Sequence, residues 1–259
     1  MKLILSLMII SIIMASCHHV YYAPNTTNAP LLSEKGETRI NALYSSGNTS
    51  EFNGGELQFA HAVSKHMGIM VNGFIAGKSE EISDWNWNQN SSHKEKGSGS
   101  YVEFAGGYFK SFDERKKWIG ELYGGFGLGS VTNEYGYGDQ SKVNNTKIFL
   151  QPSIGYKLKN FEFAVVPKVS LINWRIKENR ISSSENESAK DEMKAIGQKQ
   201  NFIAFEPALL VRGGGENFKL QLGLSFSNYK SSSTYYTESL VETLNASIGI
   251  SINLKPIKK

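Results

Sequence analysis

The sequence predicts an all-β fold: a closed antiparallel up-and-down β-barrel of about ten strands that crosses a membrane. Three observations lead to this prediction. Successive segments alternate between apolar and polar residues. Most are close to the roughly 9–11 residues that a tilted transmembrane strand needs. Short and long connections follow one another in turn, which is typical of bacterial outer-membrane barrels.

The alternation is clearest in three segments, where one parity is apolar and the other is polar or mixed. These segments are 161–174, 218–227 and 244–254. In the second, Leu220, Leu222 and Leu224 alternate with Lys219, Gln221 and Gly223. Weaker alternation predicts seven further strands, at 37–46, 55–64, 68–77, 100–110, 118–129, 146–156 and 202–213.

The connections assign the two ends of the barrel. Short turns are expected at 64–67, 111–117, 158–160 and 213–217, and long polar loops at 47–54, 78–99, 130–145, 175–201 and 228–243. We expect residues 183–200 to form a charged surface loop, because they have too few apolar residues for a packed helix face. An even strand count places both ends of the chain, and with the N-terminal end Cys17, on the short-turn rim, which is the periplasmic side of such barrels.

Alternation alone does not say which face meets lipid, but the kinds of residue do. The polar parity is rich in Gly, Ser, Asn and Gln, with isolated charges of both signs, which suits a narrow lumen better than a water-facing surface. Aromatic residues near the strand ends suit two interfacial girdles. They are Tyr44, Tyr101, Tyr108, Trp118, Tyr156, Phe161, Trp174, Phe202 and Tyr229.

Composition excludes several functional classes. The net charge of +4 comes from scattered basic residues, so no nucleic-acid partner is expected. The single cysteine excludes an internal disulfide framework and a cysteine-clustered metal site. Glycine-rich stretches such as "YGGFGLG" are not followed by a βαβ unit, so no nucleotide cofactor is expected.

The N-terminus has the layout of a secreted, lipidated protein. Lys2 precedes an apolar run over 3–14 that is too short to span a bilayer as a helix. Met14-Ala15-Ser16-Cys17 then resembles the bacterial lipobox, in which the cysteine receives lipid. The predicted organisation is a lipoprotein signal peptide over 1–16, a lipidated flexible tether over 17–36 and a β-barrel over 37–259. His18 and His19 are expected to be solvated, with no metal bound.

Beyond the lipobox, three stretches resemble the lipobox-bearing outer-membrane β-barrel proteins of the Bacteroidota, which are mostly of unknown function. They are "YYAPNTTNAPLLSEKGE", "LQFAHAVSKHMGIMVNGF" and "GELYGGFGLG", and the resemblance covers most of 21–254. It implies the outer membrane of a Gram-negative bacterium, with membrane lipid as a partner. The chain departs from the family pattern in two places. His18-His19 replaces the acidic residues of surface-exported lipoproteins, which implies an anchor on the periplasmic side, and the chain ends "INLKPIKK" without a closing aromatic.

No catalytic residue is expected. Rim proteases need carboxylates converging on one water, but Asp84, Asp139 and His93 lie in long loops without a doubled acid. A serine hydrolase needs a histidine beside the serine, and His61 and His66 lie away from the long-loop rim.

The long loops are the expected contact surface for an extracellular ligand or an envelope protein. The candidate residues are Trp85, Trp87, Tyr135, Tyr137, Tyr235 and Tyr236. Exposed tryptophans among asparagines would stack on sugar rings; alternatively, they close the loop onto the barrel rim.

The sequence therefore favours a non-enzymatic, lipid-anchored outer-membrane β-barrel with a structural or surface-presenting role. Two alternatives stay open. One is a narrow pore or uptake accessory for small solutes, although barrels of about eight strands are filled by side chains. The other is a periplasmic, lipid-anchored carrier of the lipocalin type.

Overall fold

The computed structural model describes residues 19–48, 53–86, 89–229 and 240–256, without the side chains of 80–93 and 185. Almost all of the secondary structure is antiparallel strand. The strands are β1 (Thr38–Gly47), β2 (Asn53–Ala62), β3 (Met67–Asn86), β4 (Gln89–Ser111), β5 (Trp118–Glu134), β6 (Gln140–Lys157), β7 (Phe161–Arg180), β8 (Asn201–Gly214), β9 (Phe218–Phe226), β10 (Asn228–Tyr229) and β11 (Leu244–Leu254). Among the described residues, no helix is long and apolar enough to cross a membrane.

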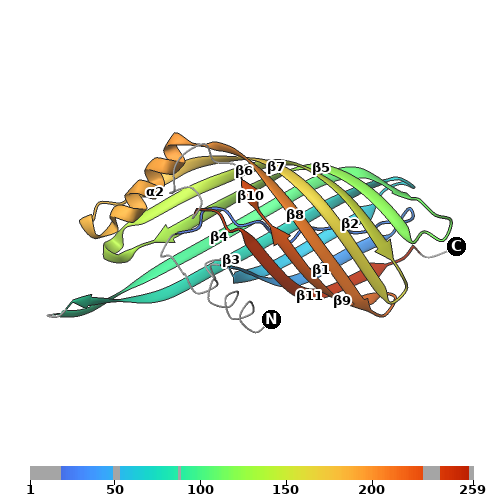
Figure 1. Cartoon of the computed structure of the whole chain (residues 1–259), viewed down its shortest axis with the longest axis horizontal. Helices are drawn as coiled ribbons and strands as arrows, with labels where there is room; N and C mark the ends of the chain where they lie inside the picture. Colours follow the sequence, from blue (N-terminus) through green and yellow to red (C-terminus); the bar gives the residue numbers. More distant parts are fainter. Residues whose placement is uncertain (1–18, 49–52, 87–88, 230–239, 257–259) are drawn as a thin grey trace, which may run out of the picture.

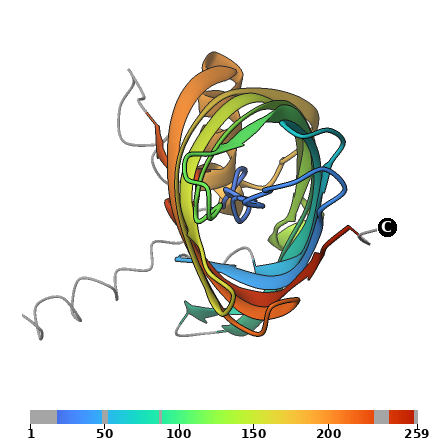
Figure 2. The same cartoon turned by 90° about the vertical axis from the view of Figure 1, so that its right-hand side faces the viewer.

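The strands close into one ring, which confirms the predicted fold class. From β1 to β9 each strand pairs with the next one in sequence, β9 pairs with β11, and β11 pairs with β1 from Leu254 opposite Thr38 to Asn245 opposite Gly47. The two-residue β10 continues β9 after Ser227, since both pair with β8 in one register. With β9 and β10 taken as one strand, the described segments therefore form a ten-stranded barrel. Figures 1 and 2 show the closed ring.

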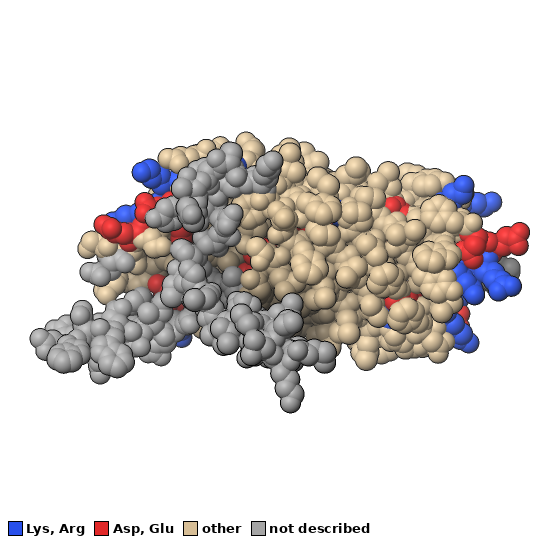
Figure 3. Space-filling model, viewed as in Figure 1, with Lys and Arg blue, Asp and Glu red and all other residues tan. Residues whose placement is uncertain are grey.

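The apolar parity faces outward and the polar parity faces the lumen. Leu222 is 55% exposed, whereas its neighbour Gln221 and the lumenal Lys168 are buried. Figure 3 shows charged side chains gathered near the two ends of the molecule, with a largely uncharged band between them. A soluble barrel would have the opposite arrangement, so this exterior is suited to hydrocarbon.

The aromatic girdles are only partly as predicted. Tyr44, Tyr108, Trp118 and Phe161 are exposed on the outer surface. Trp174 and Phe202 face inward instead and pack together at the long-loop end, with ring centroids 4.7 Å apart. Strands β6, β7 and β8 stay paired beyond the apolar band. Side chains that point inward there, such as Trp174 and Phe202, pack in a buried cluster and do not lie at the membrane interface.

The strands reach further into the expected long loops than alternation indicates. Residues 78–99 are not a loop but a hairpin, in which β3 and β4 pair from Lys78 opposite Gly97 to Asn86 opposite Gln89. Beyond the membrane both faces of a strand meet water, so the apolar alternation stops while the hydrogen-bonded ladder continues. Figure 1 shows this hairpin projecting past the rest of the rim.

The expectation of a surface loop at 183–200 is wrong. Residues Glu187–Gln198 form a 12-residue helix, α2, at the long-loop rim (Figure 1). Its buried side chains Ala189, Met193 and Ile196 follow the i, i+4, i+7 spacing of one helix face. Met193 and Ile196 pack in one cluster with Val20 and Trp174. One short apolar stripe suffices because the helix covers only the end of the lumen.

The outward orientation of Leu222 gives a direct test. We expect Leu222→Arg to lower the free energy of unfolding in lipid vesicles by about 2–4 kcal/mol, because a charge then faces hydrocarbon. Urea unfolding followed by tryptophan fluorescence measures the change. Leu222→Phe is the matched control and should unfold close to the unmodified protein. Equal stability of the arginine and phenylalanine variants would show that this face is bathed in water.

Candidate functional site: the filled lumen and the long-loop rim

Residues 19–36 fill the barrel and are not the flexible tether that was expected. Figure 2 shows this segment, in blue, inside the ring of strands. Most of its side chains are buried, including Tyr21, Tyr22, Leu31 and Leu32. The sequence does carry a signal for this placement, since residues 20–33 contain no charged residue. A solvated linker ordinarily carries charges, whereas a lumenal segment is surrounded by groups already paired with one another.

The segment enters the lumen at the short-turn rim through a tight turn at Gly36. This glycine has a φ of 84°, a conformation that favours a residue without a Cβ, and its N–H donates to the carbonyl of Ala62 at 2.8 Å. Next to the turn, Lys157 forms an ion pair with Glu37 and donates to the carbonyl of Leu31 at 2.8 Å. These contacts fix the point at which the chain passes from the lumen into β1.

Wall side chains bind the backbone of the segment along the lumen. The Thr26 N–H donates to the Glu56 carboxylate at 3.0 Å. Gln151 and Arg212 donate to the carbonyls of Asn28 and Ala29, both at 2.8 Å. An extended segment has no hydrogen-bonded partner strand of its own here, so the wall supplies the partners that its buried backbone needs.

Two clusters of buried charges lie at different levels of the lumen. In the cluster nearer the long loops, the Glu103 carboxylate lies 2.6 Å from Lys147 Nζ and 3.1 Å from Lys168 Nζ. Asn25 of the segment donates to the same carboxylate at 3.0 Å. The Tyr22 hydroxyl donates to Glu206 at 2.5 Å, so the segment contributes to this cluster with two residues.

In the cluster nearer the short turns, three cations surround one carboxylate. Glu162 forms an ion pair with Arg39 from the opposite wall and accepts from Arg212 at 3.1 Å, and Lys219 Nζ lies 3.3 Å away. All four side chains are almost fully buried. The lumen charges that were predicted from the polar parity are therefore paired with opposite charges across the barrel.

The segment leaves the lumen at the long-loop rim. Tyr21 N–H donates to the Leu240 carbonyl at 2.8 Å, and Tyr22 forms a parallel bridge with Val241. His19, the first described residue, contacts Glu95 of β4 at 3.1 Å and Glu192 of α2 at 3.4 Å. The premise that the N-terminal end stays at the short-turn rim is therefore wrong: β1 begins there, but the residues before it cross the whole barrel.

The environment of His19 stabilises its charged form. Burial opposes protonation of the ring, but hydrogen bonds and charge attraction from Glu192 and Glu95 outweigh it and raise the pKa of His19 to about 10. Within the described residues, no group of three or more His, Cys, Asp or Glu side chains is arranged to hold a metal ion. His19 forms ion pairs with Glu95 and Glu192, a contact called the latch below, so the expectation of a solvated His19 is wrong.

The candidate ligand-contact residues differ in position. Tyr135 is 4% exposed and hydrogen-bonds through its hydroxyl with Tyr21 and Ser141, so it holds the N-terminal segment and does not face outward. Tyr137 is 59% exposed in the β5–β6 connection. The side chain of Trp85, at the tip of the β3–β4 hairpin, and the residues Trp87, Tyr235, Tyr236 and Cys17 lie outside the described part of the chain.

Asp139 supports the rim. Its carboxylate accepts the Ser182 N–H at 3.0 Å and the Asn186 side-chain amide at 2.8 Å, and these hydrogen bonds lower its pKa to about 2. It therefore ties the β5–β6 connection to the start of α2. Asp84 and His93 belong to the β3–β4 hairpin, and their side chains are outside the description. Near the other rim, His61 hydrogen-bonds with Thr38 at 2.7 Å and His66 lies in a turn.

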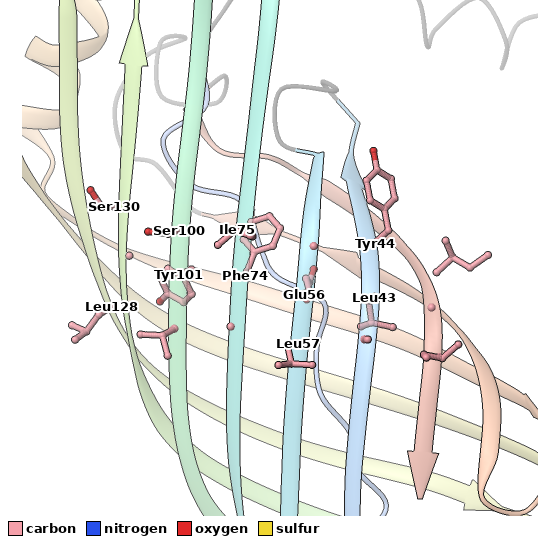
Figure 4. A pocket seen from close by; sticks show the side chains of 18 residues that line it. Leu43, Tyr44, Glu56, Leu57, Phe74, Ile75, Ser100, Tyr101, Leu128 and Ser130 are labelled. Carbon is pink, nitrogen blue, oxygen red and sulfur yellow. The ribbon is translucent and has the colours of Figure 1, made fainter.

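One large cavity lies outside the lumen. It is a depression of about 960 Å³ on the outward face of β11, β1, β2, β3, β4 and β5 (Figure 4). Its lining includes Gly55 and Gly73, where a Cβ would meet nothing closer than 4.0 Å. Outward side chains such as Leu57 and Ile75 surround it, so it belongs to the apolar exterior and not to a water-filled active site.

The described residues thus form an outer-membrane-type β-barrel whose lumen is filled by the N-terminal segment. No protein-family profile and no curated protein sequence matches the chain. Among solved structures, the chain is similar to OmpT (in-vitro folded), an outer membrane protein of Vibrio cholerae. That similarity has 7% identity and a TM-score of 0.26 and covers 89% of this chain and 100% of the other. The fold assignment rests on the strand pairing described above.

The Glu162 cluster predicts a large effect from a small change. We expect Glu162→Gln to lower the free energy of unfolding by about 3–5 kcal/mol, because three buried cations lose their counter-charge. Urea unfolding in detergent micelles measures the change. Glu114→Gln, in the exposed β4–β5 turn, is the control and should change stability by less than about 0.5 kcal/mol. If the two variants unfold at the same urea concentration, the charges around Glu162 are solvated and not buried.

The latch predicts a histidine that titrates in the alkaline range. Because the folded pKa of His19 lies above its ordinary value of 6.5, the latch contributes stability fully below about pH 6.5 and loses it as the pH rises through about 10. NMR titration of the His19 ring carbons, with the protein in detergent micelles, should give a midpoint near pH 10. In the Glu192→Gln variant the midpoint should fall. An unperturbed midpoint in the unmodified protein would mean that His19 does not contact the two carboxylates.

Proposed function

We propose that this chain is a non-enzymatic, lipid-anchored outer-membrane β-barrel that presents its long-loop rim and its N-terminal end at the cell surface. The observation that supports the proposal most is the course of residues 19–36, which run from the short-turn rim through the lumen to the long-loop rim. In outer-membrane barrels the long loops are extracellular. Such a barrel displays a surface and carries no solute through its centre.

The course of residues 19–36 also predicts on which side of the membrane a lipid on Cys17 would lie. Cys17 is two residues from His19, and two residues span at most about 7 Å, whereas the hydrocarbon core is about 30 Å thick. A lipid on Cys17 would therefore lie on the long-loop side of the membrane and not on the periplasmic side. With the barrel itself in the bilayer, the lipid adds a second membrane attachment next to the surface loops.

Neither alternative agrees as well with the geometry. A pore would require residues 19–36 to leave the lumen and abandon their contacts with Glu56, Glu103 and Arg212. A lipocalin-type carrier needs an apolar interior and a polar exterior, and the barrel has a polar interior and an apolar exterior. The exposed Tyr137 and the position of α2 at this rim support the long-loop rim as the proposed contact surface for an extracellular ligand or an envelope protein.

Accessibility of the N-terminal end on intact cells tests the proposal. We expect a short epitope inserted between Cys17 and His18 to bind antibody on intact cells, because that position would lie outside the long-loop rim. The same epitope inserted in the short turn after Gly214 is the matched control and should bind antibody only after the outer membrane is permeabilised.

Two results would reject parts of the proposal. An N-terminal epitope that becomes accessible together with the short-turn epitope would reject the surface position of the N-terminal end. A Cys17→Ala variant, exported with an ordinary signal peptide, should stay in the detergent-requiring membrane fraction and keep its heat-modifiable gel mobility. A freely soluble variant would reject the membrane barrel.

A further inference from the structure

We propose that the outward face of β5, β6 and β7 binds the phosphate-bearing headgroup of an outer-leaflet lipid through Lys142 and Lys177. The inference rests on the proposed outer-membrane setting and adds a ligand site to it. The site is a cavity of about 540 Å³ in the part of the wall just above the apolar band. Its lining is Ser130, Lys142, Asn144, Lys177 and Glu178.

The height of the cavity matches the headgroup layer. On β5 the outward residues change from Leu128 to Ser130, and on β6 they change from Ile148 through Thr146 to Asn144. Leu128 and Ile148 are 49% and 67% exposed, so the apolar surface ends directly below the cavity. A ligand with acyl chains along Leu128 and Ile148 would therefore hold its headgroup at the level of the two lysines.

A break in the strand register brings the two lysines together. Lys142 pairs with Glu178, but the next residue, Val143, pairs with Ile176, which leaves Lys177 as the extra residue on β7. A β-bulge of this kind changes the direction of a side chain and marks functional sites in many sheets. Here it adds a second cation to the cavity that Lys142 already lines.

The two lysines also have their charges available. Among the described contacts, neither Lys142 nor Lys177 forms an ion pair, whereas the Glu178 carboxylate that lines the same cavity is paired with Arg180. By contrast, Lys96 at the same rim lies 3.7 Å from Glu134. Two unpaired ammonium groups next to the amide of Asn144 offer several hydrogen-bond donors to one phosphate.

These features favour a phosphorylated lipid over a free anion. Exposed lysines far from the membrane would attract any anion weakly, but these lie where the band of hydrocarbon-facing residues ends. The Ser130 hydroxyl donates to the side-chain amide oxygen of Asn144 at 3.2 Å, so the side-chain NH₂ of Asn144 can donate to the ligand. Arg175 pairs with Asn144 across the strands and adds a further exposed cation one step below.

Binding to lipid A in nanodiscs tests the site. The full-length protein is placed in phosphatidylcholine nanodiscs containing diphosphorylated lipid A, and bound lipid A is counted by native mass spectrometry. We expect the Lys142→Ala/Lys177→Ala variant to bind about tenfold more weakly, since two charge-assisted contacts are lost. Lys96→Ala is the matched control, a lysine of the same rim with an acidic partner, and should bind as the unmodified protein does.

The other outcomes are decisive against the proposal. Unchanged binding by the double variant, or an equal loss with Lys96→Ala, would overturn the site. Displacement of lipid A by millimolar inorganic phosphate, or equal binding of dephosphorylated lipid A, would overturn the phosphorylated lipid as its ligand. Heat-modifiable mobility is measured on every variant, because a chain that never shows it would disprove the membrane barrel itself and not this site alone.

Discussion

Charge neutrality inside the lumen is the condition on which this structure depends. Acidic and basic residues are buried together inside the barrel in equal number: Glu56, Glu103, Glu121, Glu162 and Glu206 lie with Arg39, Lys147, Lys168, Arg212 and Lys219. An unpaired buried charge lowers the free energy of unfolding by several kcal/mol. Each of these groups therefore needs a partner from another strand or from residues 19–36. The pairs between Arg39 of β1 and Glu162 of β7, and between Lys168 of β7 and Glu103 of β4, connect distant walls of the ring. They therefore set the shape of the barrel as well as its charge balance.

The N-terminal segment fills the part of the lumen that the wall side chains leave open. Side chains fill the interior of an eight-stranded barrel, and two more strands make the interior wider. Residues 19–36 occupy the added room and satisfy polar groups that the wall cannot pair alone, as Asn25 does for Glu103 and Thr26 for Glu56. At the long-loop end the apolar residues Val20 and Tyr21 pack with α2 and Trp174. The filling and the cap are thus parts of one packed unit.

The local alternation predicts the closed ring well because each strand separates two unlike environments, the apolar exterior and the polar lumen. Leu222 and Lys168 lie on the faces that their parity indicates, and the ends of the ring meet at β1 and β11. The lumenal segment has one kind of surrounding on every side, so it shows no period, and its partners are distant in sequence, as Thr26 and Glu56 illustrate. The local pattern does not predict the helix α2, because its few apolar residues form a packed face only where Met193 and Ile196 meet Val20. Contacts of this kind depend on the closed ring and are invisible to a local pattern.

The chain that passes through the ring constrains the order in which the protein assembles. A closed cylinder of hydrogen-bonded strands has no side opening, and a segment threaded from one rim to the other would have to pass the Arg39–Glu162 pair that crosses the lumen. The N-terminal segment must then lie in place while the sheet is still open. The seam between β1 and β11 is consequently the natural last step, and it encloses the leading part of the same polypeptide.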